Sequence, residues 1–487
     1  MDSEQFDLLK SQGYTCIPLV HEVLADLDTP LSAYLKLAHQ PYTYLFESVQ
    51  GGERWGRYSF IGLSCAERVK VFGNTVLHEL GDGSNKQEEV ENPLTWIQTF
   101  IQQYNVPEIP ELPRFTGGMV GYFGYETIQY IEPRLKGEAK PDVLKTPDIF
   151  LMVSKELVVF DSLSGKIFLI VHVDPSNTLA LEQGKHRLKE LAENLQQPIP
   201  TISKFEESKP VNFITEFTES KFKKAVNETR EYIRAGDVMQ VVLSQRQSTE
   251  FTAPPINLYR SLRSLNPSPY MYYMNLDDFY IVGSSPEILV RLEDEEVTVR
   301  PIAGTRPRGT DAQNDLQMEQ DLLADPKELA EHLMLIDLGR NDVGRVAETG
   351  SVKLTDKMII ERYSHVMHIV SNVTGRLASQ LDAIDVLKAT FPAGTVSGAP
   401  KIRAMEIIDE FEPSKRGIYS GAVGYISWDG NMDTAIAIRT AVVKDQKLYI
   451  QAGAGIVYDS VPENEWIETN NKAGAMMKAA QVAASIT

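Results

Sequence analysis

Short runs of alternating hydrophobic and polar residues, separated by turn residues, fill the first part of the chain. The runs Glu67–Phe72, Phe150–Phe160 and Lys166–Val173 predict β-strands, and the longer pattern Leu179–Leu195 predicts a helix. Closely spaced glycines in Phe115–Glu126 predict strands that bend or approach another backbone. The first part is therefore expected to be rich in β-structure, with helices interspersed.

The pattern becomes more regular from about Phe213. Apolar residues recur at helical spacing from 219 to 235, and Gly236 ends the predicted helix. A strand at Val238–Gln247 follows, and Pro462 lies in the first turn of a last helix that runs to about Ala484. Three strands joined by short turns are predicted before that helix, at Ile418–Trp428, Asp433–Val443 and Leu448–Val457.

The least structured stretch spans 196–212. It is rich in Pro, Ser and charged residues and shows little periodicity. We therefore place the main boundary there and predict two regions, 1–205 and 206–487.

Composition limits what the chain can bind. Its 48 Lys and Arg residues against 67 Asp and Glu give a net charge of −19, which disfavours nucleic acid and anionic membranes but permits a small anion in a locally basic pocket. Two cysteines, Cys16 and Cys65, exclude a disulfide-rich scaffold and an all-cysteine zinc site. The N-terminus lacks the pattern of a signal peptide and no apolar run could span a membrane, so we expect a cytoplasmic protein.

Two pairs of glutamates lie one helical turn apart on predicted helices. Asp325 begins one helix and places Glu328 and Glu331 on one face, and Glu465 and Glu468 repeat that spacing in the last helix. Carboxylates from two facing helices would hold a hard cation such as Mg²⁺. In so acidic a chain the same spacing is also typical of a solvated helix face.

Three segments with glycine could face an anion. Arg300–Gly309 sets backbone amides among arginines, Gln451–Ile456 ends a strand on two glycines, and Val396–Lys401 leads into a helix. A stiff surface loop, a tight turn and an ordinary helix start are the respective alternatives. His365 and His368 lack zinc-site spacing and could be structural. Together these features favour a site for a small polyanion with a hard metal.

A series of motifs then resembles the chorismate-utilising enzymes, and most specifically the large subunits (component I) of anthranilate synthases. The first part matches that family at Tyr44–Gly62 (YLFESVQGGERWGRYSFIG). The second part matches it, in family order, at Ser285–Val290 (SPEILV), Pro301–Gly309, Lys327–Val346, Tyr363–Ser371, Phe391–Lys401 (FPAGTVSGAPK), Tyr419–Tyr425, Ala435–Thr440 and Gln451–Ser460 (QAGAGIVYDS).

This resemblance implies a chorismate-binding α+β fold of two sheets with flanking helices, in which 206–487 is the catalytic region. It implies Glu331 and Glu468 as Mg²⁺ ligands, with Glu328 and Glu465 beside them, and the ring carboxylate of chorismate on the metal. The other residues implied to bind substrate are Gly304, Thr305, Tyr419, Arg439, Gly453, Ala454, Gly455 and Lys472. Glu287, His368 and Thr395 match the family's catalytic positions.

The implied reaction adds ammonia to the ring carbon next to the carboxylate-bearing one, with loss of the ring hydroxyl, and then eliminates pyruvate to give anthranilate. Glu287 would protonate the leaving hydroxyl. Aminodeoxychorismate synthases usually carry a lysine where this chain has Ala303, and isochorismate and salicylate synthases use a lysine near the position of Gln240. Both differences favour anthranilate synthase. Aminodeoxychorismate synthase component I and a catalytically inactive binding subunit are the alternatives.

The resemblance extends to regulation and partners. Glu47-Ser48, Pro269, Tyr270 and Met271 match the region where tryptophan binds in feedback-inhibited members, although two ordinary strand edges would give the same pattern. Ser48 would contact the polar end of the amino acid. The two cysteines lack the context of a glutaminase nucleophile, so ammonia from glutamine would come from a separate amidotransferase subunit in a heterodimer or heterotetramer.

Overall fold

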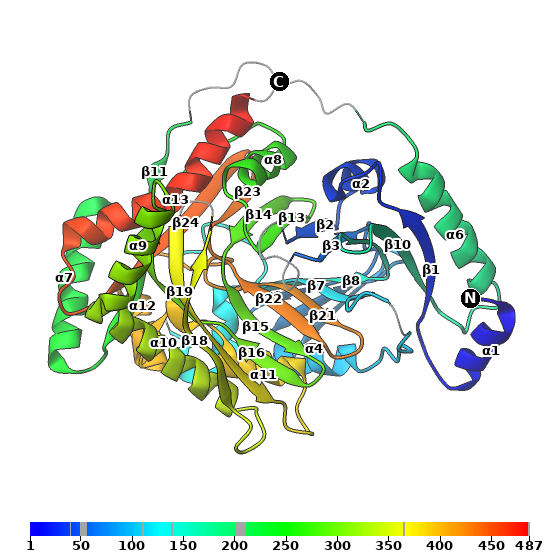
Figure 1. The fold of residues 1–487 in the computed structure, drawn as a ribbon. Coiled ribbons are helices and arrows are strands. Elements are labelled where there is room, and N and C mark those ends of the chain that lie inside the picture. Colours follow the sequence, from blue (N-terminus) through cyan, green and yellow to red (C-terminus); the bar gives the residue numbers. More distant parts are fainter. Residues whose placement is uncertain are drawn as a thin grey trace.

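Two large antiparallel sheets lie face to face and are covered by helices on their outer sides (Figure 1). The computed structural model describes residues 1–38, 40–48, 56–109, 112–137, 140–200, 211–363 and 366–485. Within these ranges each sheet has 12 strands. The expected two-sheet α+β architecture is confirmed.

The first sheet, sheet A, joins strands from both ends of the chain. Its order is β1 (Ile17–Leu24), β10 (Lys166–Val173), β9 (Glu156–Asp161), β3 (Tyr58–Gly62), β2 (Thr43–Glu47), β13 (Tyr270–Asn275), β14 (Phe279–Ser285), β23 (Thr440–Lys444), β24 (Lys447–Ile456), β12 (Gln240–Glu250) and β11 (Ile214–Thr215), with β20 (Gly398–Ala399) also on β12.

The second sheet, sheet B, is also composite. Its order is β17 (Ile302–Pro307), β19 (Val366–Arg376), β16 (Glu296–Val299), β15 (Ile288–Glu293), β22 (Met432–Ile436), β21 (Ala422–Ser427), β7 (Gly118–Phe123), β8 (Ile149–Ser154), β4 (Arg68–Phe72), β5 (Thr75–Glu79) and β6 (Asn85–Glu89), with β18 (Lys353–Arg362) also on β19. Each sheet thus combines strands from both predicted regions, through the pairs β2–β13 and β7–β21. The division at 205 stays a prediction, and residues 201–210 lie outside the described residues.

The helices cover the two outer faces. Their bounds are α1 (Ser3–Ser11), α2 (Pro30–Leu37), α4 (Pro93–Ile101), α5 (Ile128–Ile131), α6 (Ala180–Leu195), α7 (Glu219–Ala235), α8 (Pro255–Leu265), α9 (Ala312–Ala324), α10 (Pro326–Gly344), α11 (Ala383–Thr390), α12 (Lys401–Phe411) and α13 (Pro462–Ser485). The predicted helix from 219 to 235 is confirmed as α7, and Gly236 ends it with φ +84°. None of the described helices is both long and apolar enough to cross a membrane.

Apolar side chains fill the layer between the sheets, which explains why the strands read as nearly continuous hydrophobic runs. Tyr44 and Tyr272 from sheet A meet Tyr122 and Phe150 from sheet B in this layer, and all four are buried. On the outer side of sheet A, Leu188 of α6 and Met476 of α13 belong to another cluster. The core therefore consists of several apolar layers rather than one.

Two runs predicted as single strands are each two strands in different sheets. Phe150–Phe160 divides into β8 of sheet B and β9 of sheet A, and Asp433–Val443 divides into β22 of sheet B and β23 of sheet A. The second break contains neither Gly nor Pro: Arg439 itself adopts the left-handed conformation, with φ +50°. Because both halves remain buried, the hydrophobic pattern gives no sign of the change of sheet.

The crossover after β22 runs beside another one. β14 of sheet A leads through Pro286 and Glu287 to β15 of sheet B, while β22 of sheet B leads through Arg439 to β23 of sheet A. The amide of Ile436 donates to the carbonyl of Glu287 at 3.0 Å, and the amide of Ser284 donates to the carbonyl of Arg439 at 3.1 Å. These bonds fasten the two crossovers together and place Glu287 and Arg439 at the seam between the sheets.

Candidate active site

A cavity of about 590 Å³ lies where both sheets meet α10 and α13. It is lined by β12 and β24 of sheet A, by β17 and β19 of sheet B, and by the two helices. The residues predicted for catalysis, substrate binding and metal binding all line it, except Ala454. The structure thus gathers residues that are spread from Glu287 to Lys472 along the chain.

Ala454 differs from this expectation because side chains alternate along a strand. It is fully buried in an apolar cluster with Val241 and Ile407, on the face of β24 opposite to Gly453 and Gly455. The two glycines keep the cavity open. A Cβ at Gly453 would lie 2.8 Å from the Tyr419 hydroxyl, and one at Gly455 would lie 2.3 Å from Nε2 of Gln240.

Glu287 is a buried acid with an altered proton affinity. The crossover between β14 and β15 carries it into the cavity, where 7% of its surface is exposed. Burial raises the pKa of Glu287 to about 8, and weaker interactions with Thr395 and Lys472 oppose the rise. The carboxyl is therefore protonated near neutral pH and is able to donate a proton.

Arg439 is a half-buried arginine without an acidic partner in the described ranges. Burial lowers the pKa of its guanidinium from the usual value, and its Nη1 donates to the carbonyl of Lys472 at 2.7 Å. Among the described residues, no Asp or Glu forms an ion pair with it. A buried charge without a counter-ion is costly, so this guanidinium is well suited to a ligand carboxylate.

His368 lies on β19 directly opposite Thr305 on β17. Its Nδ1 is 3.1 Å from the carbonyl oxygen of Gly304 and 3.0 Å from the Thr305 hydroxyl. Burial lowers the pKa of His368, so the ring is neutral at neutral pH. Because a carbonyl only accepts, the proton belongs on Nδ1, which leaves Nε2 free to accept one. His365 lies outside the described residues.

The four glutamates line the same cavity, as the helical spacing predicts. The Asp325 side chain accepts hydrogen bonds from the first amides of α10, which starts the helix so that Glu328 and Glu331 share a face. Glu465 and Glu468 come from α13. Burial, and then the charge of Glu331, raise the pKa of Glu328.

A glutamate on α13 also has a raised pKa. Burial and the charge of Glu468 raise the pKa of Glu465, against an opposing hydrogen bond with Ser460. Carboxylates that repel one another in a cavity are a fitting donor set for a divalent cation.

The glutamates also have partners within the protein. Glu468 pairs with Lys472 at 2.7 Å, Glu331 accepts from Gln240 at 3.3 Å, and Glu328 lies 3.6 Å from Arg306. No three acidic, His or Cys side chains in the described ranges are close enough together to hold a metal. The chemistry of the donors fits Mg²⁺, and binding would require Glu468 to leave Lys472.

The comparisons with known proteins agree with this geometry. A family model described as "chorismate binding enzyme" matches residues 44–478. Anthranilate synthase component 1 of Pseudomonas aeruginosa is 58% identical, with 99% of each chain covered, and that of Aquifex aeolicus is 50% identical, with 97% of this chain and 96% of the relative covered. The chain belongs to the anthranilate synthase component 1 family of chorismate-binding enzymes.

Solved structures support the same assignment. The crystal structure of anthranilate synthase component I from Streptococcus pneumoniae has a TM-score of 0.78 and 40% identity, and covers 93% of this chain and 99% of its own. The menaquinone-specific isochorismate synthase of Escherichia coli, at 20% identity, has a TM-score of 0.71 and shares the fold. The chain is therefore a chorismate-utilising enzyme with anthranilate synthase activity.

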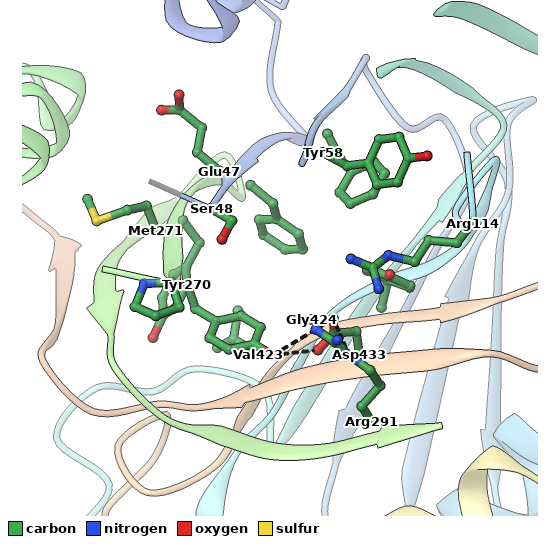
Figure 2. Close-up of a pocket in the computed structure, with 15 residues that line it drawn as sticks. Glu47, Ser48, Tyr58, Arg114, Tyr270, Met271, Arg291, Val423, Gly424 and Asp433 are labelled. Carbon is green, nitrogen blue, oxygen red and sulfur yellow. Dashed lines mark hydrogen bonds and ion pairs between the residues drawn. The ribbon is translucent and has the colours of Figure 1, made fainter. Parts of the chain in front are cut away.

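A second cavity, of about 60 Å³, contains the residues predicted to bind tryptophan (Figure 2). Ser48, Pro269, Tyr270 and Met271 all line it. The buried hydroxyl of Ser48 has no hydrogen-bond partner among the described residues. An apolar cavity of about 150 Å³ admits benzene, so an indole ring would require side chains to move.

Several residues of this cavity are not indicated by any pattern in the sequence. Arg291 pairs with Asp433 at 2.6 Å, and Tyr270 donates to Asp433 at 2.9 Å; Figure 2 shows this group on the opposite side from Glu47. Arg114 also lines the cavity. These residues come from strands far apart in sequence, and no spacing links them. Glu47 is fully engaged, because Arg263 holds its carboxylate at 2.9 and 3.0 Å.

Glu287 gives a test that depends on pH. If it is the general acid, kcat/KM for chorismate should fall as pH rises through about 8, because the carboxyl then loses the proton that it donates. Glu287→Gln should lower kcat about 10²- to 10⁴-fold and remove this decline. Anthranilate formation should be measured on both sides of pH 8 at a constant concentration of unprotonated ammonia. An unchanged rate in Glu287→Gln would exclude the acid role.

Proposed function

We propose that the enzyme binds chorismate with Mg²⁺ in the large cavity and converts it, with ammonia, to anthranilate and pyruvate. The observation that carries the proposal is Arg439, a half-buried guanidinium without an acidic partner in the described ranges. Four glutamates line the same cavity. Chorismate carries two carboxylates, so it can meet the arginine with one and a metal on the glutamates with the other.

The enolpyruvyl carboxylate is assigned to Arg439, with Tyr419, Gly453 and Gly455 beside it. A planar guanidinium suits this group because it can donate two parallel hydrogen bonds to a carboxylate. Gly453 and Gly455 leave room for the ligand, since a side chain at either would collide with Tyr419 or Gln240. Once Glu468 leaves Lys472 to bind the metal, the Nζ of Lys472, 3.0 Å from the carbonyl oxygen of Gly453, would be free for the other carboxylate.

Glu331 and Glu468 would hold Mg²⁺, with Glu328 and Glu465 beside them. When bound, the ion would neutralise these carboxylates and attract the ring carboxylate of chorismate. Glu287 would protonate the leaving hydroxyl. His368 and Thr395 line the same cavity and are assigned to the ring of chorismate, and Nε2 of His368 can accept a proton.

Two other lining residues support ammonia as the nucleophile. Ala303 lines the cavity and has no group that could attack the ring, so ammonia would attack directly. Gln240 also lines it, and its amide cannot serve as a base for water. These features favour amination to anthranilate over the aminodeoxychorismate and isochorismate reactions of related enzymes.

We further propose that a separate glutamine amidotransferase, component II, supplies the ammonia in a heterodimer or heterotetramer. The name "component 1" of the relatives agrees with a second subunit. The reaction would be the first step of tryptophan biosynthesis, in the cytoplasm. Tryptophan in the second cavity would act as a feedback inhibitor.

The purified chain tests the reaction directly. With chorismate, Mg²⁺ and ammonium it should form fluorescent anthranilate and an equal amount of pyruvate. With glutamine in place of ammonium it should form neither, because the proposal assigns the release of ammonia from glutamine to component II. A non-fluorescent aminated product would instead indicate an aminodeoxychorismate synthase, and no turnover in either reaction would indicate a binding subunit.

The metal assignment has its own test. Glu331→Gln should abolish Mg²⁺-dependent turnover and weaken Mg²⁺ binding by at least roughly 10- to 100-fold, the loss seen when partners of a metal site are removed. Glu463→Gln is the matched control, because Glu463 belongs to α13 but does not line the cavity. Titration calorimetry with Mg²⁺ gives a readout independent of activity. Native turnover in Glu331→Gln would show that this residue is not a ligand.

The inhibitor assignment predicts that Ser48→Ala weakens inhibition by tryptophan. One hydrogen bond contributes about 0.5–1.5 kcal/mol, so the inhibition constant should rise by up to roughly tenfold. The rate without tryptophan should stay unchanged, because Ser48 does not line the catalytic cavity. Ser11→Ala, at an exposed serine of α1, is the control. Unaltered inhibition in Ser48→Ala would remove this residue from the tryptophan site.

A further inference from the structure

Arg416 is a fully buried arginine behind the wall of the catalytic cavity. Only 2% of its surface is exposed, and it does not line the cavity. Its guanidinium has five N–H donors, and each is used. Nε and Nη2 donate to the Glu412 carboxylate at 2.9 and 2.7 Å, and Nη2 also donates to the carbonyl of Val242 at 2.7 Å. Nη1 donates to the carbonyl of Val396 at 2.8 Å and to the Ser420 hydroxyl at 3.1 Å.

The acceptors belong to three separate segments of the cavity wall. Val242 lies on β12 and lines the cavity itself. Val396 also lines it and directly follows Thr395. Ser420 directly follows Tyr419, whose ring centroid lies 5.5 Å from the guanidinium carbon. A single planar group therefore connects strand β12, the segment Thr395-Val396 (the Thr395 segment) and the turn Tyr419-Ser420 (the Tyr419 turn).

The Tyr419 turn needs such a support. Ser420 has φ +67°, a left-handed conformation that costs free energy in a residue other than glycine. Tyr419 also packs closely on the cavity wall, since its hydroxyl lies only 2.8 Å from the position that a Cβ on Gly453 would take. The bond from Arg416 to the Ser420 hydroxyl holds this turn against the wall.

The charge of Arg416 is balanced locally and does not reach the ligand. Glu412 is 5% exposed and binds the guanidinium through both carboxylate oxygens. Its Oε1 also accepts from the amide and the hydroxyl of Ser244, each at 2.8 Å. The pair is thus fully satisfied, whereas Arg439 inside the cavity has no acidic partner in the described ranges. Arg416 therefore bonds within the protein, whereas Arg439 can bind a ligand.

We propose that Arg416 is a positioning residue for anthranilate synthesis, which fixes the Thr395 segment and the Tyr419 turn relative to β12. Lysine cannot replace it, because an ammonium is a point charge with three donors and lacks the planar fork. Errors of about 1 Å in the placement of reacting groups cost about 10²-fold in rate. The role therefore affects turnover more than the affinity for chorismate.

The first experiment compares Arg416→Lys with Arg68→Lys. Arg68 is the control, because its side chain is only 16% exposed and donates to Glu79 and to the carbonyls of Cys65 and Ala66, none of which lines the catalytic cavity. Arg416→Lys should lower kcat about 100-fold with at most a several-fold change in KM for chorismate. Arg68→Lys should change both only several-fold.

Ser420→Gly separates positioning from stability. Glycine accepts φ +67° without strain, which offsets much of the cost of the lost hydrogen bond, so the variant should fold with only a small loss of melting temperature. It lacks the hydroxyl that Arg416 holds, so its kcat should fall about tenfold, as expected for a lost hydrogen bond near the upper end of its range. A stable Ser420→Gly variant with native kcat would overturn the proposal, including when Arg416→Lys fails to fold. So would equal losses of kcat in the two lysine variants.

Discussion

The catalytic cavity depends on two neighbouring crossovers between the sheets. One strand pair is β14 with β23 in sheet A, and the other is β15 with β22 in sheet B. The chain passes between the sheets at Glu287 in one direction and at Arg439 in the other. Backbone groups at such a break lose their ladder partners, and here the two crossovers satisfy one another through Ile436 and Ser284. Glu287 and Arg439 are thereby fixed at adjacent points of the backbone.

Burial then gives these two residues their chemistry. Glu287 has a raised pKa because it is desolvated without a strong counter-ion. Desolvation likewise lowers the pKa of Arg439, which has no acidic partner in the described ranges. Elsewhere the protein pairs its buried arginines, as Arg416 with Glu412 and Arg291 with Asp433. The contrast marks the cavity as the place where charge is left for a ligand to balance.

The second cavity is built on the same strands. Tyr270 on β13 lies directly opposite Ser285 on β14, next to the crossover that carries Glu287. Asp433, which receives the Tyr270 hydroxyl, lies on β22, which leads to Arg439. A third cavity, of about 490 Å³, shares Pro269 and Tyr270 with the second and Pro286 and Ile302 with the catalytic one. Tyr270 and Asp433 thus connect the second cavity to the strands of both crossovers.

Features that depend on local spacing can be read directly from the amino-acid sequence. The helix from 219 to 235, the start of α10 at Asp325 and the shared faces of the glutamate pairs follow from periodicity and capping, and the motifs from Ser285 to Ser460 determined the family. Features that depend on burial, or on a strand's change of sheet, are visible in the folded molecule alone. The division of Asp433–Val443 at Arg439 left the hydrophobic pattern intact, and strand alternation turned Ala454 into the core. The partners of Arg416 lie 4 to 174 positions away in the sequence, so no pattern along the chain could show that one guanidinium joins them.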